Sequence, residues 1–161
     1  MLINMPIQYH FFTEDSALVA WVTGKVTFKG MNDYSANLVK QTGYHHNMNS
    51  FYDLTNCNDI DGDLEHLSLF AAILNNHEAF PTPCKTAILL PQNNEKIHRI
   101  VRGLILMVSR SNIEHRYFAE SERGQAYDFV DFNPDLIFKL ENHATFDEPA
   151  SLRQPRQFDT E

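Results

Sequence analysis

The sequence has little of several features that mark specialised classes of protein. Only two cysteines, Cys57 and Cys84, occur in 161 residues, which excludes a disulfide framework and is typical of a reducing compartment. No apolar run approaches the roughly 20 residues that a transmembrane helix requires. The first residues also lack the basic start and apolar stretch of a signal peptide. The sequence therefore predicts two free thiols in a soluble, cytoplasmic protein with no membrane span.

Positive charge is scarce too. Against 21 Asp and Glu residues the chain has 13 Lys and Arg, a formal net charge of −8, and such a surface repels nucleic acids and anionic membranes. The common enzyme fingerprints are missing: there is no Cys-x-x-Cys pair, glycine-rich nucleotide loop, His-Glu-x-x-His helix or Gly-x-Ser-x-Gly elbow. We therefore expect no nucleic-acid partner, no cofactor and no catalytic activity.

Strand and helix patterns alternate along most of the chain. Residues 7–13 and 17–23 are rich in aromatic and β-branched side chains and predict a hairpin, and later strands are expected at 50–55, 86–90 and 116–119. Helices are expected at 33–42, 64–74, 95–110 and 121–130, and a short one at 133–142, where Asn133 and Pro134 form a start signal. A polar loop is expected from Asn56 to Gly62, with Asp61 or Asp63 capping the helix that follows.

This order predicts an α/β fold with a mixed, mostly parallel sheet of about five strands and an antiparallel N-terminal strand. About four helices and a short C-terminal helix complete it. With 43% hydrophobic residues, the chain can bury one core. We expect a single domain over residues 1–142 and a mobile tail over residues 143–161.

Four short motifs, in the same order, resemble those of the STAS superfamily, and within it the SpoIIAA-like group of small bacterial proteins. They are Gly24-Lys25-Val26-Thr27, Asp53-Leu54-Thr55, Lys85-Thr86-Ala87-Ile88, and Tyr117-Phe118 with Ala126. The likeness covers about residues 7 to 131 and implies a STAS fold. It also implies a non-catalytic regulatory or protein-interaction module of a bacterial cytoplasmic pathway. The phosphorylatable serine of anti-sigma-factor antagonists is missing, because Ile60-Asp61-Gly62-Asp63 stands in its place.

The resemblance places a protein partner at the loop before the second helix, with the docking residues Thr55, Asn56, Asn58, Asp59, Asp61 and Asp63. Ligands of parallel sheets usually meet the carboxyl ends of the strands. That edge would present Lys25, Lys29, Asn93 and Asn94. A simpler interpretation of the acidic residues is that they cap the helix and favour its positive end.

Other functions remain open from the residues alone. Twelve phenylalanines and six tyrosines are compatible with a carrier or sensor of a small apolar ligand, a role that lipid carriers of related fold also suggest. We expect the opposite edge to hold four histidines and four acidic residues, which leaves a metal-dependent enzyme open: His45, His46, His77, His115, Glu14, Asp15, Glu78 and Glu114. Cys57 with His66 is the alternative nucleophilic pair. A homodimer through a sheet edge or the 133–142 helix is also open.

Overall fold

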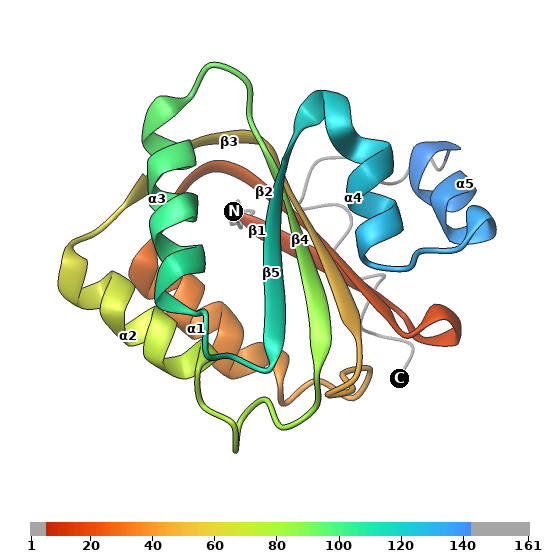
Figure 1. Cartoon of the computed structure of the whole chain (residues 1–161), viewed down its shortest axis with the longest axis horizontal. Coiled ribbons are helices and arrows are strands. Elements are labelled where there is room, and N and C mark those ends of the chain that lie inside the picture. Colours follow the sequence, from red (N-terminus) through yellow and green to blue (C-terminus); the bar gives the residue numbers. More distant parts are fainter. Residues whose placement is uncertain (1–5, 143–161) are drawn as a thin grey trace, which may run out of the picture.

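A computed structural model describes residues 6–142 as an α/β domain built on one five-stranded sheet. The predicted tail, 143–161, lies outside the described residues. Figure 1 shows that helices cover both sides of the sheet. In chain order the elements are β1 (Ile7–Phe12), a 3-10 turn (Thr13–Asp15), β2 (Ala17–Thr27), α1 (Phe28–Leu38), β3 (Asn49–Asp61), α2 (Leu64–Leu74), β4 (Cys84–Leu90), α3 (Glu95–Met107), β5 (Ile113–Ala119), a second 3-10 turn (Glu120–Glu122), α4 (Arg123–Phe129) and α5 (Pro134–Asn142).

The strands follow the sheet in the order in which they follow the chain. β1 pairs antiparallel with β2, and β2 to β5 are parallel neighbours, which confirms the predicted mixed sheet. Crossovers of one hand that always step the same way leave their helices on the same face, so α1, α2 and α3 together cover one face (Figure 1). The order never reverses along β2 to β5, so these strands form no switch point of the kind where α/β sheets open a crevice.

Each face of the sheet has its own apolar core. Under α1, α2 and α3, residues such as Val22, Leu54 and Ile97 are buried together. Under α4 and α5, Phe51, Leu89 and Leu136 are buried. β4 lies between β3 and β5 and is buried on both faces from Thr86 to Leu90, as its continuous apolar run predicts.

Strands β2 and β3 run further than predicted, and the expected polar loop from Asn56 to Gly62 is mostly strand. β3 continues to Asp61, and the β2–β3 register shifts twice, between Trp21 and Thr23 and between Gly24 and Lys25. Gly24 has a φ of 67°, a conformation that suits a bulge. The shifts disturb the alternation of buried positions in the second half of β3, where the buried residues are Leu54, Cys57 and Ile60.

Helix α1 begins five residues earlier than predicted. Thr27 caps it by accepting a hydrogen bond from the Gly30 amide at 2.9 Å, and the helix ends at Leu38 rather than at Thr42. Phe28, Met31 and Leu38 line its inner face. That helical spacing is visible in the sequence, so the prediction of a helix from Asp33 was wrong because the glycine in the first turn was read as a break.

The remaining predicted elements are present, with small shifts at their ends. Asp63 caps α2 and Asn94 caps α3, with hydrogen bonds to the amides of His66 and Ile97. Asn133 caps α5 through the Leu136 amide at 2.8 Å, as predicted. Among residues 6–142, no helix is both long and apolar enough to cross a bilayer.

A partly buried ion pair joins the sheet to α4. Asp53 on β3 is 9% exposed and accepts a hydrogen bond from Arg123 at 3.0 Å. Its other carboxylate oxygen accepts hydrogen bonds from the amide and the hydroxyl of Thr55. The Arg123 guanidinium also lies over the Phe51 ring. Because both carboxylate oxygens are occupied, this contact fixes where α4 sits on its face of the sheet.

Candidate functional site

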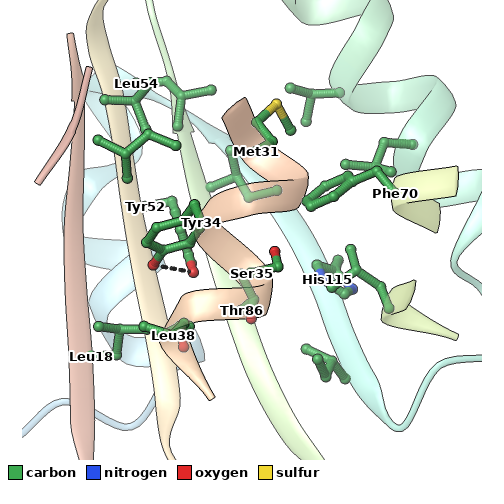
Figure 2. Close-up of a pocket in the computed structure, with 18 of the residues that line it drawn as sticks. Leu18, Met31, Tyr34, Ser35, Leu38, Tyr52, Leu54, Phe70, Thr86 and His115 are labelled. Carbon is green, nitrogen blue, oxygen red and sulfur yellow. Dashed lines mark hydrogen bonds between the residues drawn. The ribbon is translucent and has the colours of Figure 1, made fainter. Parts of the chain in front are cut away.

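A cavity of about 130 Å³ lies between helices α1, α2 and α3 and the face of the sheet that they cover. Figure 2 shows α1 crossing above the strands, with side chains of the helices and of the sheet pointing into the space between them. Most of the lining is apolar, including Leu18, Leu54, Phe70 and Leu104. None of the lining residues is Asp, Glu, Lys or Arg. The space therefore favours uncharged, apolar contents.

Two tyrosines form a polar contact at one wall of the cavity. The hydroxyls of Tyr34 on α1 and Tyr52 on β3 lie 2.8 Å apart and share a hydrogen bond (Figure 2). Tyr9 packs edge-on against Tyr34 with 5.4 Å between ring centroids. Burial raises the pKa of both Tyr34 and Tyr52 well above the ordinary value. Both phenols therefore stay protonated, and this wall carries no charge.

A second polar region lies on the floor of the cavity. Ser50, Thr86 and His115 come from the adjacent strands β3, β4 and β5, and Ser35 of α1 also lines the space. Burial lowers the pKa of His115 from 6.5 to about 4, opposed only by the nearby backbone of Ile113. The imidazole is therefore neutral at physiological pH.

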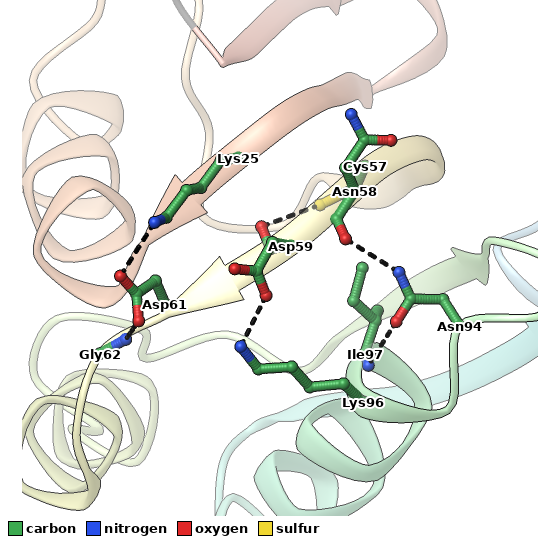
Figure 3. Close-up of polar contacts among 9 residues, drawn as sticks. All are labelled: Lys25, Cys57, Asn58, Asp59, Asp61, Gly62, Asn94, Lys96 and Ile97. Carbon is green, nitrogen blue, oxygen red and sulfur yellow. Dashed lines mark hydrogen bonds and ion pairs between the residues drawn. The ribbon is translucent and has the colours of Figure 1, made fainter.

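The residues predicted to dock a partner are gathered at one end of the sheet and contact one another or their neighbours. Figure 3 shows Asp59 paired with Lys96 at 2.7 Å and Asp61 paired with Lys25 at 3.2 Å. The Asn58 carbonyl accepts a hydrogen bond from the Asn94 side chain. The other members have local roles: Thr55 hydrogen-bonds Asp53 and Asp63 caps α2, while Asn56 lies in β3.

The predicted ligand edge is also occupied by contacts within the chain. Lys25 pairs with Asp61, and Lys29 pairs with Asp33 one turn along α1 at 2.8 Å. Asn93 has a φ of 56° and Asn94 caps α3, so both shape the turn into that helix. The structure does not bring these four residues together around a cavity, and none of them lines the one described above.

The histidines at the opposite edge are dispersed. Within residues 6–142, no three His, Cys, Asp or Glu side chains lie close enough together to hold a metal ion. The His77 ring nitrogen Nε2 contacts the Arg110 carbonyl at 2.8 Å. His115 lines the cavity rather than lying in a polar loop. The structure thus separates the candidates that the sequence grouped together.

The two thiols are free, as predicted. Cys57 lies inside β3 and is buried, and Cys84 opens β4 and lines the cavity. Burial raises the pKa of each thiol to about 11. Because the thiolate is the nucleophile, neither cysteine is activated at neutral pH. Cys57 also has its sulfur near the Asp59 carbonyl at 3.6 Å.

No protein-family model and no curated protein matches this chain. The STAS resemblance consequently stays a prediction, and the general α/β class with its mixed sheet is what the structure itself establishes.

The residues that build the cavity were missed at the sequence level. Tyr34, Ser35 and Tyr52 were treated as ordinary members of a helix and a strand. Two signals in the sequence pointed to this region. Thr86 is a hydroxyl at the start of a buried run, and His115 lies among residues of a strand rather than in a loop. Neither signal reveals a cavity, since free volume depends on how far α1 stands from the sheet.

Proposed function

We propose that this protein binds a small, uncharged apolar molecule in the cavity between α1, α2, α3 and the sheet, and acts as a non-catalytic carrier or sensor of it. The cavity itself is the observation that carries this proposal. A cavity of about 150 Å³ lined by Leu, Ile and Phe side chains binds benzene. A volume of about 130 Å³ therefore suits a ligand of about one ring.

An unfilled cavity of this size would also destabilise the folded protein. A void in a protein core destabilises the folded state by about 24 cal/mol per Å³. An empty space of 130 Å³ would cost about 3 kcal/mol on that scale, a large share of the 5–15 kcal/mol that stabilises a typical domain. A ligand that fills the space recovers the lost contacts.

Benzene binding followed by methyl NMR tests this proposal. Leu18, Leu54 and Leu104 line the cavity, so their methyl resonances should shift on titration. Leu89 and Leu136 belong to the core under α4 and α5 and serve as internal controls. Saturable shifts confined to the first group support the proposal, whereas no shift, or equal shifts on both faces, contradicts it.

A matched pair of variants at Ser35 sharpens the result. Ser35 is buried on α1 and points into the cavity (Figure 2). Ser35→Leu places apolar volume in the space and should abolish benzene binding while the protein remains folded. Ser35→Ala removes the same hydroxyl without filling the space and should keep the binding. Equal affinity of both variants for benzene would place the binding elsewhere.

A second candidate is a protein-docking module of the STAS type. Its support is that the Asp61 and Asp63 side chains stay 54% and 65% exposed, and that surface ion pairs contribute only about 0–1 kcal/mol. A partner could therefore displace them at little cost. Asp59→Asn, Asp61→Asn and Asp63→Asn together should abolish recovery of a bound polypeptide from the host. Unchanged recovery of that polypeptide by the triple variant would show that these residues do not form the docking site.

A further inference from the structure

A polar stripe crosses the floor of the otherwise apolar cavity. Ser50 is paired in register with Thr86, and Thr86 with His115. All three side chains line the cavity, so they stand in a row across β3, β4 and β5 on the face that α1 covers. Figure 2 shows Thr86 and His115 on the sheet side of the space and Ser35 on the helix side.

The groups of this stripe face the cavity, and one of them has an unpaired atom. Ser35, Ser50 and Thr86 each contribute a hydroxyl-bearing side chain to the lining. In the part of the chain that the structure describes, Nδ1 of His115 is buried and makes no hydrogen bond. The hydroxyls of Tyr34 and Tyr52, in contrast, share a hydrogen bond. Buried polar groups are normally paired, so the unpaired nitrogen of His115 calls for a polar group from a ligand, and the hydroxyls beside it can add to that contact.

The stripe offers both donors and acceptors but no charge. Each hydroxyl can donate one hydrogen bond and accept others, and a neutral imidazole has one donor and one acceptor nitrogen. No Asp, Glu, Lys or Arg lines the cavity, and burial keeps His115 neutral by lowering its pKa to about 4. A charged ligand would have to lose its hydration with no opposite charge to replace it.

We propose that the cavity selects an uncharged ring compound that carries a hydroxyl group, with the ring against the apolar wall and the hydroxyl between Thr86 and His115. This inference rests on the proposed function and names the chemistry of its ligand. Phenol is the simplest representative of the class. It is neutral at pH 7, because a phenolic hydroxyl has a pKa of about 10.

Calorimetric titration of the full chain at pH 7 with benzene, phenol and benzoate tests the inference. The three probes share one ring and differ in the polar group. We expect phenol and benzene both to bind, and only phenol binding to depend on the polar stripe. Benzoate should bind at least 100-fold more weakly than phenol, because its carboxylate would be buried without a partner.

Two variants separate the stripe from the apolar wall. Thr86→Val removes one hydroxyl at nearly constant shape and His115→Leu removes the imidazole. Each should weaken phenol binding about tenfold, the loss of one hydrogen bond in a buried site, with little change for benzene. Ile88→Val is the matched control, since Ile88 lines the cavity from the same strand. It should affect benzene and phenol alike.

The outcomes distinguish this inference from the proposed function. Phenol affinity that is unchanged in both Thr86→Val and His115→Leu would overturn the stripe while benzene binding still supported the cavity. Benzoate that binds as tightly as phenol would overturn the preference for an uncharged ligand. If neither benzene nor phenol binds, both the proposed function and this inference are wrong. Benzene binding in each variant also reports that the variant is folded.

Discussion

His115 should make the protein less stable in mild acid, by an amount that follows from its surroundings. Burial lowers its pKa from 6.5 to about 4, whereas an imidazole in the unfolded chain titrates near pH 6.5. Between these values the unfolded state binds one more proton than the folded state. The free energy of unfolding therefore falls by about 1.4 kcal/mol per pH unit as the pH decreases, and levels off below pH 4. From pH 7 to pH 5 the loss due to His115 is about 2 kcal/mol.

Urea unfolding of the wild type and of His115→Leu at pH 7 and pH 5 measures this loss. Both proteins contain the other histidines, so the difference between their two pH responses isolates His115. With a urea slope of about 2 kcal/mol per M, the wild-type midpoint should fall by about 1 M more than that of the variant. Equal decreases in the two proteins would refute the argument, because His115 would then titrate in the folded state much as it does in the unfolded chain.

Three further predictions follow from other contacts. Gly62→Ala should destabilise the protein by about 2 kcal/mol or more in a thermal melt, because Gly62 has a φ of 147° and an added Cβ would overlap the Phe28 ring. Gly124→Ala is the control and should not destabilise the protein, because a Cβ there meets nothing within 4 Å. Asp53→Asn should lower the free energy of unfolding in urea by about 1–3 kcal/mol, since Arg123 loses its charged partner but keeps 32% of its side chain exposed. Glu114→Gln breaks the exposed pair with Arg116 and should lower the free energy of unfolding by under about 1 kcal/mol. At pH 8 the two thiols should react slowly with a thiol reagent in the native protein and quickly in denaturant, because burial raises the pKa of both to about 11. Rapid labelling of Cys57 in the native protein would contradict its placement inside β3.

The parts of the fold that the sequence predicts well are those in which burial is regular. β4 is buried on both faces and has a continuous apolar run, while α2 and α3 have apolar residues at helical spacing. Their order along the chain is enough to predict a mostly parallel sheet. The end of β3 was missed for a physical reason. Beside the shifts in register, its buried positions from Leu54 onward fall at every third residue, and a polar segment with such spacing looks like a loop.

The candidate site is harder to predict, because it depends on distances between elements. Ser50, Thr86 and His115 are 65 residues apart along the chain at their extremes, and only the strand register aligns them. A cavity arises where side chains of α1 and the sheet leave space, and no local pattern records that. In contrast, the acidic residues that stood out in the sequence form ion pairs and helix caps.

A crystal structure of the protein soaked with phenol would show whether the cavity holds a hydroxylated ring. We expect a planar ring between α1 and the sheet, with its oxygen within hydrogen-bond distance of Thr86 or His115 and the surrounding side chains placed as they are in Figure 2. A cavity closed by collapsed side chains, or one that holds only ordered water while phenol binds elsewhere, would contradict it.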